Sequence, residues 1–352
     1  MTPLTIADRI TNHRKMMGSA LTIMAHHYQT EDVIRHADIT GDSLELAKKV
    51  SQIESKHIMF CGVYFMAESA ALLSRPGQFV HLPEPSAECS MALMSPADRL
   101  DKVMCALTAS GRKVVPLAYV NSTLAVKAVV GLHGGAVCTS ANALKMLQWA
   151  VNSGDAVLFL PDKNLGANIA DTVGIPQEER HIIDIRSGGT RLDMEAANKA
   201  SLLLWPGFCA IHARFNLRQI ERIRTEHPGA KVIVHPECTP EVVAASDFAG
   251  STSSIINYVK DQPAGATVVI GTEINLVERL ASKYSGKLSI MPLVESACTH
   301  MAQTTETTLI DALDALAESE KTKKISKYQV SVADHLKADA KRSLDTMLRV
   351  VE

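Results

Sequence analysis

Short apolar runs alternate with helical patterns along the whole chain. This alternation is typical of α/β proteins, in which helices cover parallel sheets. Three of the runs, at residues 22–29, 114–123 and 230–239, end in polar side chains. Each is predicted to be a first strand, and a short helical segment follows it.

The same order of elements then occurs three times. A second short strand ends in a cluster of hydroxyl side chains, at residues 38–43, 136–142 and 248–254. Each cluster opens a helical pattern, and a third strand and a fourth apolar run follow it. Because such self-similarity indicates a repeated structural unit, the sequence predicts three copies of a four-stranded unit.

Each fourth apolar run leads to a cysteine. These closing cysteines are Cys89, Cys209 and Cys298. The expected domains are residues 1–89, 90–209 and 210–298, and residues 299–352 are expected to complete the first of them. The second copy is longer than the others, and its extra length is predicted to be an insertion near residues 170–200.

Composition excludes several classes of protein. The net charge of -2 over 352 residues does not indicate a nucleic-acid-binding surface. The first residues begin as a polar helix without the apolar stretch of a signal peptide. The most apolar segment, residues 58–67, is too short to span a bilayer. We therefore expect a cytoplasmic protein with no membrane or nucleic-acid partner.

The seven cysteines are widely spread, a pattern that in a reducing cytosol indicates metal binding, catalysis or packing. Cys61, Cys105 and Cys138 lie within strand or helix patterns and are interpreted as packing residues. Cys238 is open to either interpretation. The three closing cysteines stand on loops at equivalent positions of the repeats. If the repeats pack around a common axis, their thiolates converge and can hold an iron–sulfur cluster or zinc.

Polar side chains follow the three predicted first strands. The pairs are His26 with Tyr28, Tyr119 with Asn121, and His235 with Glu237. The members of a pair alternate along the strand and so point to the same side. Because the carboxyl ends of parallel strands line the ligand crevice in α/β sheets, three such pairs predict a site, although any single pair could be ordinary surface residues. His27 would point the other way and is interpreted as structural.

The hydroxyl clusters predict anion binding. Their candidate residues are Ser43, Ser140, Ser251 and Thr252. They stand where strands give way to helices, whose N-termini present free N–H groups and a positive dipole end. The same hydroxyls can serve as N-caps, and the two roles are compatible. Three such turns suit a substrate that carries several negative groups.

Many segments together resemble the quinolinate synthase family, the [4Fe–4S] enzymes of de novo NAD biosynthesis. They are AHHYQ, GDSLELA, FCGVYFMAESA, ECSMA, AYVNST, CTSANA, PDKNLG, WPGFCAIHARF, VIVHPEC, GSTSS, GTE and SACTHM. The resemblance implies three similar αβα domains around a pseudo-threefold axis, with the cluster at their junction. It also implies a condensation of iminoaspartate with dihydroxyacetone phosphate that loses phosphate and two waters and gives quinolinate.

The resemblance also implies roles for individual residues. The implied cluster ligands are Cys89, Cys209 and Cys298. The implied catalytic residues are His26, Tyr28, His212, His235 and Glu237, with Glu237 as a partner of Tyr28 in proton transfer. The implied substrate-binding residues are Ser43, Tyr119, Asn121, Ser140, Ser251 and Thr252. An iron without a protein thiolate would act as a Lewis acid on the substrate.

Other interpretations of the same residues remain. The diphthamide-synthesis enzymes also bring one cysteine from each of three domains to a cluster, but they use S-adenosylmethionine. A non-catalytic iron–sulfur sensor would need no acid–base groups around its cluster. A structural zinc protein usually has four closely spaced ligands, a spacing that this sequence lacks. Under the resemblance, an aspartate oxidase or dehydrogenase is a candidate partner that supplies iminoaspartate.

Overall fold

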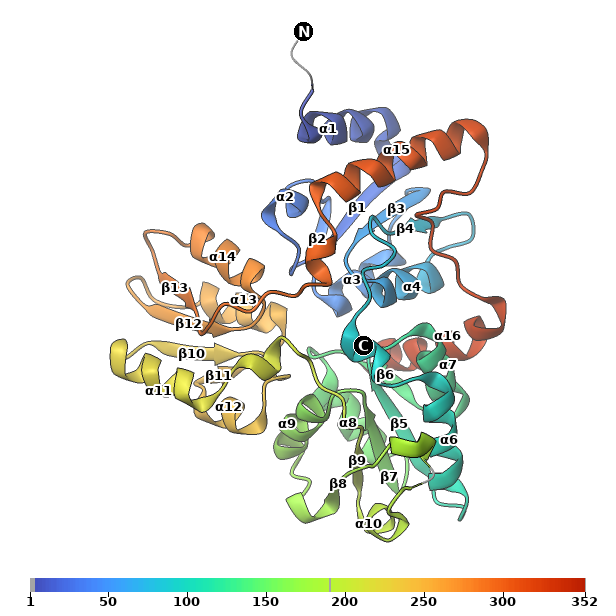
Figure 1. Ribbon diagram of the computed structural model, residues 1–352, viewed down its shortest axis with the longest axis vertical. Helices are drawn as coiled ribbons and strands as arrows, with labels where there is room; N and C mark the ends of the chain where they lie inside the picture. Colours follow the sequence, from blue (N-terminus) through green and yellow to red (C-terminus); the bar gives the residue numbers. More distant parts are fainter. Residues whose placement is uncertain (1–3, 190, 352) are drawn as a thin grey trace. The chain divides into compact units, whose positions relative to one another are not determined.

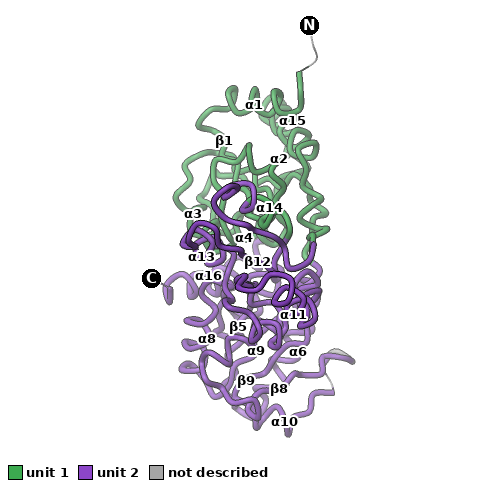
Figure 2. The backbone as a smooth tube through the Cα atoms, turned by 90° about the vertical axis from the view of Figure 1, so that its left-hand side faces the viewer, with its two compact units in different colours: residues 1–89, 274–279, 297–333 green, residues 90–273, 280–296, 334–352 purple. Residues whose placement is uncertain are grey.

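The computed structural model describes residues 4–189 and 191–351 and confirms the α/β class. Its strands form three parallel sheets flanked by helices (Figure 1). The chain divides into two compact units (Figure 2). The first unit takes the described residues of 1–89, 274–279 and 297–333. The second takes those of 90–273, 280–296 and 334–352.

The first unit contains one sheet, with the strand order β2-β1-β3-β4. Its strands are β1 (Leu21–His26), β2 (Ile39–Gly41), β3 (His57–Cys61) and β4 (Phe79–His81). Its helices are α1 (Ile6–Met17), α2 (Glu31–Ile34), α3 (Ser43–Val50), α4 (Tyr64–Leu73) and α15 (Glu306–Thr322). Apolar side chains of α1, α15 and the sheet, including Ile10, Ile23 and Leu313, form one buried core.

The second unit contains two sheets, of which the first has the order β6-β5-β7-β9-β8. Its strands are β5 (Val114–Tyr119), β6 (Ala136–Cys138), β7 (Ala156–Leu160), β8 (Arg180–Ile182) and β9 (Leu202–Leu204). Its helices are α5 (Ser90–Leu93), α6 (Ala97–Thr108), α7 (Leu124–Leu132), α8 (Ala143–Val151), α9 (Lys163–Val173) and α10 (Met194–Lys199). The predicted insertion corresponds to β8 and α10, and β8 adds a fifth, outermost strand.

The other sheet of the second unit has the order β11-β10-β12-β13. Its strands are β10 (Lys231–Val234), β11 (Phe248–Ala249), β12 (Thr267–Gly271) and β13 (Ser289–Pro292). The accompanying helices are α11 (Leu217–Glu226), α12 (Pro240–Ala245), α13 (Thr252–Lys260) and α14 (Ile274–Lys283). Residues 274–279 of α14 belong to the first unit.

Four strands of each sheet share one topology, which confirms the predicted repeat of a four-stranded unit. The second strand of each repeat pairs with the first, the first with the third, and the third with the fourth. Successive connections therefore turn to opposite sides of the first strand. In such sheets the ligand crevice lies at the carboxyl ends of the strands, at this reversal. The predicted polar pairs stand at the carboxyl ends of β1, β5 and β10, the strands at the reversal.

The two longest helices near the C-terminus pack in different units. α15 packs against α1 in the first unit, whereas α16 (Asp334–Val351) packs against α7 in the second. Gly131 of α7 makes this approach possible, because a Cβ there would stand 1.9 Å from the carbonyl oxygen of Asp339. Residues 299–333 thus belong to the first unit and the described residues of 334–352 to the second. The bounds of the three domains stay a prediction. Neither these two nor any other described helix is long and apolar enough to cross a membrane.

Candidate functional site

The cysteines differ in burial. The thiols of Cys61, Cys138 and Cys238 are buried, and burial raises the pKa of each, to about 12 for Cys61. These thiols stay protonated and pack as apolar groups. Cys105 is exposed on α6. The partly buried cysteines are Cys89, Cys209 and Cys298, which stand on the irregular segments after β4, β9 and β13.

The segment WPGFC holds Cys209 close to the end of β7. Trp205 is buried, and its Nε1 donates to the carbonyl of Met94 at 2.8 Å. Gly207 lies against the backbone, because a Cβ there would stand 2.5 Å from the carbonyl oxygen of Pro161. The N–H of Cys209 donates to Oδ2 of Asp162 at 3.1 Å. These contacts place the backbone of Cys209 beside Asp162, the cap of α9.

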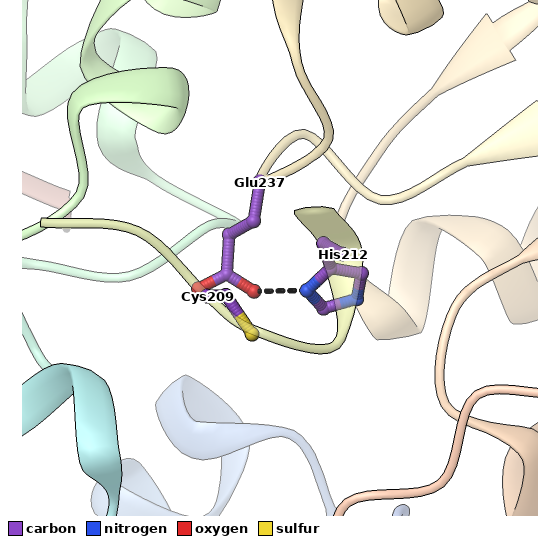
Figure 3. Close-up of side chains that lie close together, drawn as sticks. All are labelled: Cys209, His212 and Glu237. Atoms are coloured by element: carbon purple, nitrogen blue, oxygen red, sulfur yellow. Dashed lines mark ion pairs between the residues drawn. The ribbon is translucent and has the colours of Figure 1, made fainter. Parts of the chain in front are cut away.

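Two buried imidazoles share one carboxylate oxygen in the second unit. Nδ1 of His212 lies 2.7 Å from Oε2 of Glu237, and Nδ1 of His235 lies 3.1 Å from the same oxygen (Figure 3 shows the first pair). The two rings stack with their centroids 4.4 Å apart. Nε2 of His212 lies 3.1 Å from the hydroxyl of Thr272, at the end of β12. The loop after β10 and the 3-10 turn after Cys209 thus meet at Glu237.

Opposing effects set the protonation of Glu237, His212 and Asp162. Burial raises the pKa of Glu237, but the two imidazoles outweigh it and hold that pKa well below its usual range. Burial lowers the pKa of His212, and the neighbouring His235 lowers it further. Asp162 is the opposite case, because burial and then the charge of Glu237 raise its pKa well above the usual value. The pKa of Glu237 is therefore lowered while that of Asp162 is raised. Such opposite shifts are common where several charged groups lie close together in a functional site.

One thiol, one imidazole and one carboxylate gather into a possible metal-ligand set. The ligand atoms of Cys209, His212 and Glu237 all lie within 4.8 Å of one another (Figure 3). Among the described residues, Oε1 of Glu237 is a buried oxygen with no hydrogen-bond partner. Sulfur, nitrogen and oxygen donors in this arrangement suit iron or zinc. One predicted cluster ligand thus lies beside two predicted catalytic residues.

In the first unit, the rings of His26 and Tyr28 lie together after β1. Their centroids are 4.8 Å apart in an edge-to-face arrangement, and the Tyr28 N–H donates to Nδ1 of His26 at 3.1 Å. The imidazole of His27 lies elsewhere, with Nε2 3.7 Å from Oε2 of Glu45 on α3. His26 is buried and Tyr28 is half-buried.

Tyr119 is the last residue of β5 in the second unit, and Asn121 stands two residues after it. Tyr119 is buried, and its carbonyl accepts the hydroxyl of Ser122 at 3.0 Å. Oδ1 of Asn121 is a buried oxygen without a hydrogen-bond partner in the described part of the chain. An acceptor left in this state is costly unless a ligand or water satisfies it. Asn121 is therefore the member of this pair that most clearly calls for a partner.

The predicted anion-binding hydroxyls lie at or just before helix N-termini. Ser251 caps α13 by accepting the Ser254 N–H, and Thr252 is the first residue of that helix. Ser43 is the first residue of α3, whose cap is Asp42. Ser140 stands in the turn that precedes α8. The capping role of Ser251 is confirmed, and anion binding stays a prediction for all four hydroxyls.

Asp162 and Thr272 are site residues that the sequence does not predict. Asp162 accepts the N–H of Cys209, and the hydroxyl of Thr272 contacts Nε2 of His212. Asp162 stands in the segment PDKNLG and Thr272 in GTE, and neither segment indicates a role for these two residues. The available signal was their common place directly after a third strand, at the carboxyl edge of the sheet.

A family model described as quinolinate synthetase A protein, NadA, matches residues 8–349. The chain belongs to the NadA quinolinate synthetase family. Curated relatives named quinolinate synthase agree across most of their length. The protein of Acidobacterium capsulatum is 40% identical over 97% of this chain and 92% of its own. That of Geobacillus kaustophilus is 42% identical over 95% and 90%, and that of Bacillus pumilus 45% identical over 80% and 76%.

Membership of the NadA family decides between the interpretations of the sequence. The resemblance to quinolinate synthases is confirmed, and the relatives carry the name of an enzyme. The diphthamide-type alternative and the non-catalytic sensor are therefore set aside. A solved D-2-hydroxyisocaproate dehydrogenase has 11% identity and a TM-score of 0.18 over 88% of this chain, which is too low to support any argument.

Proposed function

We propose that this protein catalyses the condensation of iminoaspartate with dihydroxyacetone phosphate, releasing phosphate and two waters and giving quinolinate for NAD biosynthesis. Family membership supports the enzyme class and the product. The reaction combines a transfer-type condensation with dehydrations, so it needs anion binding, proton transfer and an electrophile. The partly buried cysteine beside the His212–Glu237 pair is the observation that carries the proposal.

The proposed cofactor is a [4Fe–4S] cluster, and the chemistry of the cysteines fits it. One partly buried thiol follows the last strand of each repeat, whereas three other thiols are buried and protonated. The proposed ligands are Cys89, Cys209 and Cys298. When bound, a cluster with three protein thiolates supplies an iron that can polarise a substrate oxygen as a Lewis acid.

Proton transfer is proposed for residues at the ends of the first strands. Glu237 is held ionised by the two imidazoles, and its carboxylate is proposed to orient the ring of His212, whose Nδ1 lies 2.7 Å from Oε2. The phenol of Tyr28 is the proposed acid, with His26 against its ring and Glu237 as its proton partner. His235 and His212 complete the proposed catalytic set.

Substrate anchoring is proposed for hydroxyl and amide groups near helix N-termini. The proposed anchors are Ser43, Tyr119, Asn121, Ser140, Ser251 and Thr252. The N-terminus of α13 presents a positive dipole end for carboxylate or phosphate, whereas at α3 the cap Asp42 already accepts the N–H groups of Leu44 and Glu45. The unpartnered Oδ1 of Asn121 shows that its amide has hydrogen-bonding capacity to offer. Several anchors suit a pair of substrates with two carboxylates and one phosphate.

The setting proposed for this reaction is the reducing cytoplasm, because the seven cysteines are widely spread along the chain, a pattern that indicates metal binding or packing rather than disulfides. An aspartate oxidase or dehydrogenase is the proposed source of iminoaspartate. The deciding experiment purifies the protein without oxygen, measures iron and sulfide, and assays quinolinate from the two substrates. About four iron per chain and quinolinate formation are expected. Product formation in an iron-free preparation would overturn the cofactor, and iron without product would overturn the reaction.

A further inference from the structure

The loops after β1 and β10 form the same turn around a histidine. The N–H of Tyr28 donates to Nδ1 of His26 at 3.1 Å, and the next N–H donates to the His26 carbonyl at 3.0 Å. After β10, the N–H of Glu237 donates to Nδ1 of His235 at 3.4 Å, and the next N–H donates to the His235 carbonyl at 3.0 Å. Tyr28 and Glu237 are therefore the middle residues of equivalent turns.

In the second unit, two asparagines of α9 hold three consecutive carbonyls of the turn after β10. Nδ2 of Asn168 donates to the carbonyls of Pro236 and Cys238, both at 2.8 Å. Nδ2 of Asn164, one helical turn earlier, lies 3.4 Å from the carbonyl of Glu237. Both asparagines are buried. The backbone around Glu237 is thus tied to one face of one helix.

In the first unit, α14 holds the turn after β1 in the same way. The guanidinium of Arg279 donates to the carbonyls of His27 and Gln29, the latter at 3.2 Å. Nδ2 of Asn275, one helical turn earlier, donates to the carbonyl of Tyr28 at 3.2 Å. In both turns an asparagine holds the middle carbonyl, and the residue four positions later holds the two flanking carbonyls.

The two helices also occupy equivalent places in the sequence. α9 follows β7 and α14 follows β12, which are the third strands of their repeats. They begin with the related segments DKNL and EINL, whose asparagine is the donor to the middle carbonyl. Side chains four apart lie on one helix face, so this spacing delivers both donors to one loop. The same pattern twice, in separate units, makes a chance arrangement a poor explanation.

We infer that Asn164, Asn168, Asn275 and Arg279 are positioning residues that fix the backbone carrying Glu237 and Tyr28. The turns cannot shift without leaving buried carbonyls unsatisfied, which is costly. A displacement of about 1 Å in a reacting group can lower the rate by about 100-fold. The effect of these residues on catalysis rests on the proposed function. Their effect on the order of the two turns does not.

The test uses two variants that serve as controls for each other. Asn168→Leu removes the flanking donors of the turn after β10, and Arg279→Met removes those of the turn after β1. Amide hydrogen exchange followed by mass spectrometry reads peptides over residues 232–240 and 22–30 separately. Each variant is expected to speed exchange by about tenfold or more in its own loop. The other loop should exchange as in the wild type.

The kinetic readout distinguishes positioning from general destabilisation. In both variants kcat for quinolinate formation should fall by about 10- to 100-fold, while the KM of each substrate stays within about twofold. Arg279→Lys, which keeps a cationic donor, should recover part of the loss. Asn198→Leu on α10 and Arg222→Met on α11 alter exposed side chains and should match the wild type.

Unchanged exchange in the targeted loop, or equal loosening of both loops by either variant, would overturn the inference. If each variant speeds exchange only in its own loop but kcat does not fall, the catalytic part of the inference is overturned. If the wild type forms no quinolinate, the proposed function fails while the exchange data still test the positioning. Asn164→Ala and Asn275→Ala each remove only the donor to the middle carbonyl of one turn. They take the place of Asn168→Leu and Arg279→Met if those two variants do not fold.

Discussion

Asp162 divides its two carboxylate oxygens between a helix and a cysteine. Oδ1 caps α9 by accepting the N–H groups of Asn164 and Leu165, at 2.7 and 3.0 Å. Oδ2 accepts the N–H of Cys209 at 3.1 Å. A single side chain thus fixes the start of the helix that carries the positioning asparagines and the backbone of a proposed cluster ligand.

Asp162→Asn separates these two roles. Asparagine is a good N-cap, so the cap on α9 should survive. The amide has only one acceptor oxygen, so the Cys209 N–H loses its partner, at a cost of about 1–3 kcal/mol in the free energy of unfolding. Iron should leave the anaerobic variant faster when a chelator is added. Asp193→Asn, which alters the cap of α10 by the same exchange, is the control. Equal rates of iron loss in both variants would contradict this role of Asp162.

The burial of the thiols predicts which cysteines hold iron. Cys89→Ser, Cys209→Ser and Cys298→Ser should each lose most of the iron and sulfide and the absorption of the cluster, because a cluster needs thiolate ligands. Cys105→Ser, which changes an exposed cysteine on α6, should keep both at the wild-type level. Iron and sulfide analysis of anaerobic preparations checks the set. A fully loaded Cys209→Ser variant would remove Cys209 from the ligands.

Tyr28→Phe removes the hydroxyl that is the proposed proton donor and keeps the aromatic ring. The ring contact with His26 should persist, because it involves the ring of Tyr28 rather than its hydroxyl. General acid–base catalysis is worth about 100- to 10,000-fold, so kcat should fall within that range while the iron content is unchanged. Tyr284→Phe, a comparably half-buried tyrosine on a cation-rich surface, serves as the control. Wild-type kcat in Tyr28→Phe would assign the proton to another group.

Stability should depend on pH through His81 in the first unit. Burial, and then the charge of His57, lowers the pKa of His81 from 6.5 to about 3, although Glu320 opposes the shift. The unfolded chain therefore binds a proton that the folded chain excludes. The stability that neutral His81 contributes is complete above pH 6.5. Below that pH the free energy of unfolding falls by about 1.4 kcal/mol per pH unit, down to a pH of about 3.

Denaturant unfolding between pH 7 and pH 4 checks this prediction. His81→Gln does not titrate and can still hydrogen-bond His57, whose Nδ1 lies 3.1 Å from Nε2 of His81. The variant should lose less stability on acidification than the wild type. His335→Gln on α16 alters an exposed histidine and should follow the wild-type curve. Parallel curves for His81→Gln and the wild type would refute the assignment.

The inner strands could be predicted from the sequence because their signals are local. Apolar runs, their polar ends and the hydroxyl clusters recur in order, and the four strands that they form have the same order in all three sheets. The packing of α16 could not be predicted in this way. It depends on the absent side chain of Gly131, which lets the backbone of Asp339 approach, and this is a contact between segments far apart in the chain.

Side chains that act through the backbone of another loop also escaped prediction. Asn168 and Arg279 differ in type, and each contacts carbonyls more than 60 residues away. Residue identity alone gives no sign of such contacts. The recurrence of Asn-Leu after an acidic residue at the starts of α9 and α14 was the usable signal, since it marks equivalent places in the repeat. The candidate ligands and acid–base residues were easier to find because their chemistry is in their side chains.

The three repeats differ at the outer side of the strand that leads to each cysteine. β9 is flanked by β8 along its length, β4 meets a single bridge from His81 to Gln329, and β13 ends its sheet. Edge strands open more readily than strands paired on both sides. Fraying should therefore begin at β13 and reach the segment of Cys298 first, while the segment of Cys209 is the last of the three to loosen.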